Sequence, residues 1–134
     1  MVQRSRHGPT QRQLRVGELV RHTLVEVLAR GDVRDPDLEG IIVTVSEVRV
    51  SPDLRHATAF VAPLGGGDAA PIVKALTRCK RFLRGELGRR ITMKFTPELH
   101  FEADRSFDEA SHIDEILRSD RVRRDLAEED GEAE

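Results

Sequence analysis

Residues 41–64, IIVTVSEVRVSPDLRHATAFVAPL, decide the fold, because two strand-like runs are separated here by only a short turn. The first run, residues 41–50, is rich in β-branched side chains, and residues 55–64 form the second. The Ser-Pro-Asp sequence at 51–53 is a turn signal, and so short a connection predicts an antiparallel hairpin. The apolar parity shifts between Val45 and Val48, which predicts a β-bulge near Ser46 and Glu47.

Further elements are predicted on both sides of the hairpin. Before it, Thr10 is a candidate cap for a helix that runs to Arg30 and carries one apolar stripe, formed by Val16, Leu19, Val20, Leu24, Val27 and Leu28. After it, the sequence predicts a helix over 70–87, a strand over 91–103 and a short helix over 106–119. This α-β-β-α-β order predicts an α+β two-layer domain, in which a three-stranded sheet carries its helices on one face.

The 134 residues are enough for one domain with tails. We expect a basic, flexible arm over 1–11, a folded domain over 12–118 and a disordered acidic tail over 119–134, because the ends lack periodic apolar residues. The sequence shows no secretory signal and no apolar run of membrane-spanning length, and its single cysteine excludes an internal disulfide. A monomeric, cytoplasmic protein is therefore expected.

The charge is unevenly distributed, although the net charge is only −2. Residues 1–30 and 71–100 have balances of +4 and +6, whereas residues 101–134 have a balance of −8. Two basic segments beside an acidic end are typical of a protein with a nucleic-acid surface. Ordinary solvated helix surfaces explain the same charges. The arrangement of charged side chains around the helix over 70–87 has to distinguish the two explanations.

Residues 72–88 separate apolar from basic side chains on a helical wheel. The apolar sector contains Ile72, Leu76, Cys79, Leu83 and Leu87. The opposite half contains Lys74, Arg78, Lys80, Arg81 and Arg84, together with Gly85 and Gly88. A solvated helix usually mixes both signs, whereas an unmixed basic surface attracts phosphate. We expect the backbone of a nucleic acid to bind this side and the following Arg89 and Arg90, with Arg4, Arg6 and Arg12 as secondary contacts.

The aromatic residues favour recognition of RNA by shape and backbone. Trp and Tyr are absent, and the phenylalanines mostly occupy positions of core parity: Phe60, Phe82, Phe95, Phe101 and Phe107. Modules that read bases by stacking them on surface aromatics are therefore not favoured. Structured RNA is the expected partner.

Three segments carry a family resemblance: RVGELVRHTLVEVLARGDVRDPDL, VTVSEVRVSPDLRHATAFVAPLG and ALTRCKRFLRGELGRRITMKFTPELHFEAD. They resemble the ribosome-binding factor A family, most specifically in residues 50–61 and 82–104. The resemblance implies a type II KH-like fold and a non-catalytic assembly factor without metal or cofactor. Proteins of this family bind free 30S subunits, assist late maturation of 16S rRNA and its precursor 5′ end, and support growth in the cold. Ribosomal proteins are further candidate partners.

The resemblance also assigns the glycine pair at Gly85 and Gly88, which has the G-x-x-G spacing of the loop by which KH modules bind RNA backbone. In this family an Ala-x-Gly kink replaces that loop. Aligned on Phe-Leu-Arg, the kink falls at Cys79, Lys80 and Arg81, with cysteine in place of the alanine and arginine in place of the glycine. The glycine pair therefore lies after the kink and is not the KH loop.

One group of residues suggests an enzyme instead. Glu98, His100, Glu102 and Asp104 share one face of the predicted strand, as metal ligands or acid-base groups do. A solvated sheet face explains the same alternation, and ligands from one strand lack a converging partner. The other four histidines show no metal-binding spacing and are expected at the surface: His7, His22, His56 and His112. Cys79 is expected to pack inertly.

Two alternatives to an assembly factor stay open. The first is a metal-dependent ribonuclease that uses the face formed by residues 98–104. The second is an adaptor whose acidic tail binds basic ribosomal proteins.

Overall fold

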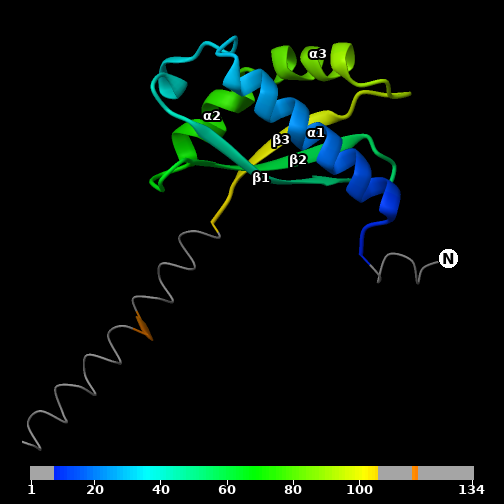
Figure 1. Ribbon diagram of the computed structural model, residues 1–134, viewed down its shortest axis with the longest axis horizontal. Coiled ribbons are helices and arrows are strands. Elements are labelled where there is room, and N and C mark those ends of the chain that lie inside the picture. Colours follow the sequence, from blue (N-terminus) through cyan, green and yellow to red (C-terminus); the bar gives the residue numbers. More distant parts are fainter. Residues whose placement is uncertain (1–7, 106–115, 118–134) are drawn as a thin grey trace, which may run out of the picture. The chain divides into compact units, whose positions relative to one another are not determined.

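The computed structural model describes residues 8–105 and 116–117. Its elements are, in order, α1 (Gln11–Ala29), the short 3-10 helix η2 (Pro36–Leu38), β1 (Val43–Val50), β2 (His56–Pro63), α2 (Ala70–Arg78), α3 (Lys80–Arg90) and β3 (Glu98–Ala103) (Figure 1). The predicted acidic tail and most of the helix predicted over 106–119 lie outside the described residues. The same holds for five residues named above: Arg4, Arg6, His7, Phe107 and His112. No helix of the described part is both long and apolar enough to cross a membrane.

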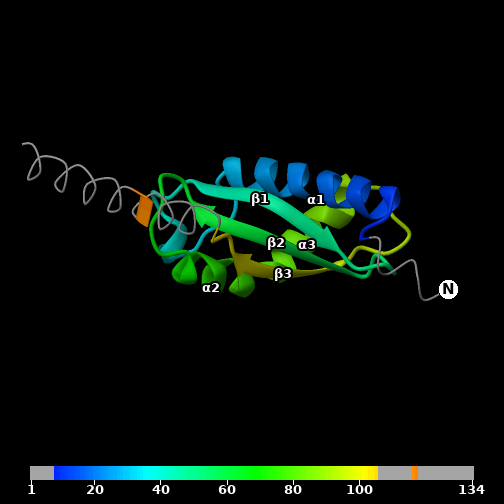
Figure 2. The ribbon, with the colours of Figure 1, turned by 90° about the horizontal axis from the view of Figure 1, so that it is seen from below.

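The sheet has the order β1-β2-β3, in which β1 and β2 are antiparallel and β2 and β3 are parallel. The predicted hairpin is confirmed, and so is the bulge: Val45 pairs with Val61 and Glu47 with Phe60, which leaves Ser46 without a partner in the register. Figures 1 and 2 show α1, α2 and α3 on one face of the sheet. The other face is open to solvent, so strand residues alternate between buried and accessible positions.

Helix α1 begins as predicted, because Thr10 and Gln13 form a capping box. Its buried stripe includes Val20, Leu24 and Val27, but the expectation that Leu19 is buried is wrong: this side chain is 46% exposed. The stripe that faces β1 is narrower than predicted and includes the buried Gln13, whose Nε2 donates to the carbonyl of Val50 at 2.9 Å.

The single helix that periodicity predicts over 70–87 is divided in the structure, and the kink that the family resemblance places at Cys79 is confirmed. The chain breaks at Cys79, whose φ of −96° and ψ of 6° are not helical, and its amide donates to the carbonyls of both Ala75 and Leu76. The two shorter helices bury Ile72 and Leu76 on one side of the break and Leu83 and Leu87 on the other. The kink therefore forms without its usual Ala-x-Gly residues, and the Gly85–Gly88 pair lies inside α3.

The strand predicted over 91–103 begins only at Glu98. Residues 92–97 run without regular structure, and Pro97, which precedes the strand, has no amide hydrogen to donate to a ladder. Phe95 lies in this segment rather than in a strand, so its side chain is 51% exposed instead of facing the core as predicted. Phe82 is also exposed, and Phe60 lies beneath a guanidinium on the open face, so only Phe101 is buried among the described phenylalanines.

Candidate nucleic-acid interface

The exposed sides of α2 and α3 carry the predicted basic surface. Since Leu76 and Leu83 are fully buried, the side chains opposite them face solvent. Three of the predicted cations, Lys74, Lys80 and Arg81, are exposed and have no acidic partner among the described residues. We call these three residues the free cationic surface.

Arg84 extends this surface toward the segment that follows α3. Its Nε and Nη2 donate to the carbonyl oxygen of Thr96, at 3.3 and 2.9 Å. The guanidinium is exposed, and its partner is a neutral carbonyl, so its positive charge is not cancelled. Arg84 thereby connects α3 with residues 92–97.

Arg78 is exposed as the helical wheel predicts, but it does not belong to the free cationic surface because it is paired with acids; its contact with RNA stays a prediction. Its Nε and Nη2 donate to the carboxylate of Asp35 at 2.9 and 2.8 Å, and Nη2 also donates to Asp37 at 2.8 Å. The Asp35 side chain is only 8% exposed. The hydrogen bond from Arg78, with one from the amide of Asp37, holds the pKa of Asp35 below its usual range. Arg78 therefore stabilises the fold by joining the end of α2 to η2.

Arg89 and Arg90 are also engaged within the fold. Both donate to Glu86, at 2.6 and 3.1 Å, and Arg90 lies 3.7 Å from Glu26 of α1. The hydrogen bonds from Arg89 and then Arg90 lower the pKa of Glu86, so this carboxylate is ionised near neutral pH. Their charges are partly compensated, and they are weaker candidates for phosphate contacts than Lys80 or Arg81.

A second basic region lies where α1 begins, beside the 51–55 turn and the residues 92–95 that follow α3 (Figure 1). A cavity of about 630 Å³ opens between these segments. Four cations line it: Arg12, Arg15, Arg55 and Lys94. The predicted secondary contact Arg12 belongs to this region, whereas Arg15, Arg55 and Lys94 were not predicted.

An exposed aromatic ring lies among these cations. The guanidinium carbon of Arg55 is 4.5 Å from the centre of the Phe95 ring, and Nζ of Lys94 is 5.7 Å from it. The nearby acid, Asp53, accepts hydrogen bonds from the Ser51 hydroxyl at 2.6 Å and the Arg55 amide at 3.1 Å. These bonds lower the pKa of Asp53 and occupy its carboxylate within the turn. A cationic pocket with a ring that can stack is thus available.

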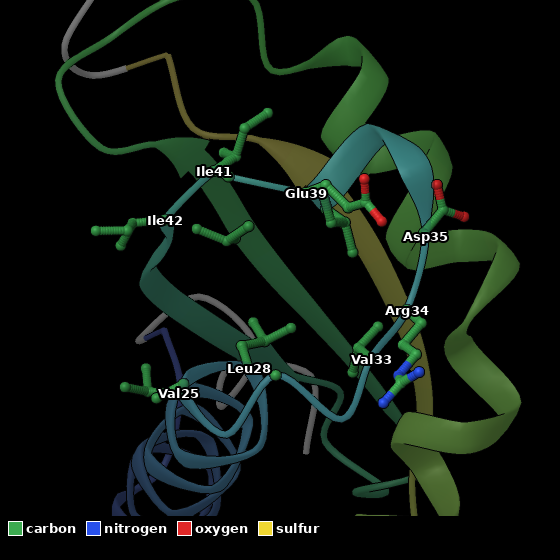
Figure 3. Close-up of a pocket in the computed structure, with 13 residues that line it drawn as sticks. Val25, Leu28, Val33, Arg34, Asp35, Glu39, Ile41 and Ile42 are labelled. Carbon is green, nitrogen blue, oxygen red and sulfur yellow. The ribbon is translucent and has the colours of Figure 1, made fainter.

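A pocket beside the end of α1 has a different character. It has a volume of about 720 Å³ and lies between the end of α1 and residues 31–43. Figure 3 shows aliphatic side chains around it, among them Val25, Leu28 and Ile42, with Asp35 at its edge. Its titratable lining residues in the described part of the chain are Arg34, Asp35 and Glu39, and the carboxylate of Asp35 is bound to Arg78. The pocket therefore lacks a nucleophile paired with a base.

Cys79 is suited to packing rather than to nucleophilic chemistry. It is half-buried against the core at the kink. Burial, followed by the charge of Asp35, raises the pKa of its thiol, and a raised pKa disfavours the reactive thiolate. This agrees with the inert role expected from its place on the apolar sector.

The open face of the sheet holds the residues that suggested an enzyme. Glu98, His100 and Glu102 point to this exposed face, whereas Asp104 follows the end of β3. The expectation that one strand lacks a converging partner is wrong, because His56 of β2 approaches: its Nδ1 lies 3.0 Å from Nε2 of His100. Glu98 lies opposite His56 in the register.

Comparison with known proteins agrees with this architecture. The family model described as ribosome-binding factor A matches residues 12–117. The chain belongs to the ribosome-binding factor A family. It is 61% identical over 129 residues to the ribosome-binding factor A of Maricaulis maris, covering 94% of this chain and 92% of that one. A relative from Methylorubrum extorquens is 60% identical over 119 residues, which are 89% of this chain and 82% of the relative.

Solved structures of ribosome-binding factor A proteins share the fold. The crystal structure from Thermus thermophilus matches with a TM-score of 0.59 and 26% identity, over 70% of this chain and 98% of that one. The solution structure of a Thermotoga maritima protein described as a putative ribosome binding factor A matches with a TM-score of 0.61 and 30% identity. The match covers 74% of this chain and 92% of that one. Another match is a Thermus thermophilus homology model fitted into a cryo-EM map of a 30S–RbfA complex. Its TM-score is 0.53 and its identity 29%, over 66% of this chain and 91% of that one.

Proposed function

We propose that this protein binds the free 30S ribosomal subunit through 16S rRNA and assists late steps of its maturation, without catalysing a reaction itself. It acts in the cytoplasm as a monomer, supports processing of the precursor 5′ end and contributes to growth in the cold. Membership of the ribosome-binding factor A family supports this proposal, as does the likeness to a relative fitted into a map of a 30S–RbfA complex.

The observation that carries the proposal is the free cationic surface on α2 and α3. Lys74, Lys80 and Arg81 are held outward by the burial of the opposite sides of these helices, and no described acid neutralises them. Such charges release counterions when they contact phosphate, which favours binding to any nucleic-acid backbone. The kink at Cys79 lies between Lys74 and Lys80, so the surface spans two helices and can contact two parts of a folded RNA.

The pocket around Phe95 extends the proposed interface. Arg84 reaches from α3 to the carbonyl of Thr96, next to Phe95 and Lys94. We expect phosphates to contact Arg12, Arg15 and Lys94, and an unstacked base to contact Phe95 or the guanidinium of Arg55. Such a base belongs to a loop or an end of rRNA, because bases within a duplex are not accessible to a side-chain ring.

Co-sedimentation tests this function against its alternatives. The purified protein is expected to sediment with free 30S subunits and much less with assembled 70S ribosomes. Cleavage of precursor rRNA on addition of Mg²⁺ or Mn²⁺ indicates the ribonuclease instead. Binding to small-subunit proteins that persists after their RNA is digested indicates the adaptor. Failure to sediment with 30S subunits under low-salt conditions contradicts the proposal.

A further inference from the structure

His56, Glu98 and His100 form a compact group on the open face of the sheet, away from the helices. His56 and Glu98 are register partners on the parallel strands β2 and β3, and His100 follows Glu98 by two residues on the same face. The distance is 3.0 Å from His56 Nδ1 to His100 Nε2 and 3.9 Å from His56 Nδ1 to Glu98 Oε2. One donor atom from each residue lies within 4.8 Å of the other two.

These distances approach those of a coordination sphere. With Zn–N bonds of about 2.0–2.1 Å and a tetrahedral angle, two ligating nitrogens lie about 3.3 Å apart. The two imidazole nitrogens here are 3.0 Å apart, so side-chain rotations that move them apart by a few tenths of an ångström bring them to that separation. The carboxylate of Glu98 needs a larger movement, because its Oε2 lies 3.9 Å from His56 Nδ1 and the three donor atoms lie within 4.8 Å of one another, but its side chain is 59% exposed and can change rotamer.

The backbone beneath the group is fixed. The amide of His56 donates to the Ser51 hydroxyl at 3.0 Å, and its carbonyl accepts from the Ser51 amide at 2.9 Å. β3 is held in register with β2 from Glu98 to Ala103. Ligands on paired strands are therefore already placed on one side, and a metal ion would need only side-chain rotations to bind.

A hydrogen bond between the two imidazoles is the competing explanation. The rings are stacked with centroids 5.2 Å apart, and a neutral pair shares one proton between the facing nitrogens. This hydrogen bond is exposed to water, which offers both rings equivalent partners, and it leaves Glu98 outside hydrogen-bonding distance. It therefore explains the contact of the rings but not the convergence of the third group.

We propose that His56, Glu98 and His100 bind one Zn²⁺ ion, with the remaining coordination position open to solvent. Two imidazole nitrogens and one carboxylate oxygen are a ligand set typical of zinc, whereas Mg²⁺ and Ca²⁺ prefer oxygen ligands throughout. The proposal depends on the open face alone and not on rRNA binding by α2 and α3.

Isothermal titration of the full-length protein with ZnCl₂ at pH 7.5 tests the proposal. Wild type is expected to show one site that involves these residues, and His56→Gln and His100→Gln are each expected to weaken it by at least about tenfold. His22→Gln is the matched control: this exposed histidine lies on α1, and its contact is with Glu18 at 3.4 Å. Its removal is expected to leave the affinity unchanged.

NMR of the imidazole groups identifies the ligands directly. On addition of one equivalent of Zn²⁺, the His56 and His100 signals are expected to move while that of His22 does not. Amide spectra of the two variants show whether they remain folded, which is expected because all three ligand side chains are exposed. Equal zinc affinity in wild type and both folded variants, or no binding by wild type, overturns the proposal and leaves the proposed rRNA binding untouched.

Discussion

The guanidinium of Arg78 donates a hydrogen bond to each carboxylate oxygen of Asp35, a residue 43 positions earlier in the chain. This bidentate pair joins the last residue of α2 to η2, and with it the connector that forms one wall of the aliphatic pocket beside the end of α1. A cation on the outward side of a helix thereby stabilises the fold.

The pH dependence of stability tests this role of Arg78. The pKa of Asp35 is lowered in the folded protein, chiefly by the hydrogen bond from Arg78, so the pair stabilises above the ordinary carboxyl pKa of about 4. This stabilisation is lost as the pH falls through the lowered pKa. Arg78→Gln is expected to decrease the unfolding midpoint at pH 7, and the difference from wild type should shrink below about pH 4. A constant difference from pH 7 to pH 2 contradicts the assignment.

Gly17→Ala is expected to destabilise the protein, whereas Gly85→Ala is not. A Cβ at Gly17 would lie 2.6 Å from the carbonyl oxygen of Val48, so α1 must move away from β1, at a cost of about 1–3 kcal/mol. At Gly85, inside α3, the nearest atom is Nη1 of the flexible Arg89 side chain at 3.7 Å. Alanine there should be neutral or stabilising by up to about 1 kcal/mol. Urea unfolding of both variants measures the difference, and the opposite ranking contradicts the packing described.

Binding to 30S subunits should weaken steeply with salt. With about four to six phosphate contacts, the affinity is expected to fall by about a hundredfold or more between about 50 and 200 mM monovalent salt. Sedimentation or fluorescence titrations over this range provide the slope of log Kd against log salt concentration. A flat response excludes a phosphate-dominated interface and favours contacts with ribosomal proteins.

Phe95→Leu is expected to weaken 30S binding while preserving the fold. Leucine retains an apolar side chain but removes the ring on which a base can stack, an interaction of about 1–3 kcal/mol. Phe60→Leu is a matched control, because Phe60 also lies under an arginine, with Arg49 4.8 Å from its ring centre, but on the open face. Titration of 30S subunits with both variants distinguishes them. Equal affinities would remove Phe95 from the interface.

The sequence contains most of the information that specifies the fold. Thr10 as a cap, the hairpin and the bulge beside Ser46 depend on local signals within a few residues, and the structure confirms each of them. The break at Cys79 was not readable from periodicity, because Leu76 and Leu83 are seven residues apart and fit one continuous helix as well as two.

The candidate sites were less predictable, because they depend on contacts between distant segments. The Arg78–Asp35 pair spans α2 and the connector, and the approach of His56 to His100 requires the parallel register of β2 and β3. The predicted strand includes Phe95, but β3 starts three residues later, at Glu98. A helical wheel shows which side chains point outward but does not show which of them already have an acidic partner.

The most direct test of the account is the affinity for free 30S subunits of a variant that reverses the free cationic surface. The triple variant Lys74→Glu, Lys80→Glu and Arg81→Glu removes three charges without a described intramolecular partner, so its stability should change little. Each reversal is expected to cost roughly 1–3 kcal/mol of binding free energy. Arg49→Glu, on the opposite face of the sheet, should bind like wild type. If the triple variant binds 30S subunits normally while Gly85→Ala abolishes binding, the glycine pair is the RNA-binding element and the account is wrong.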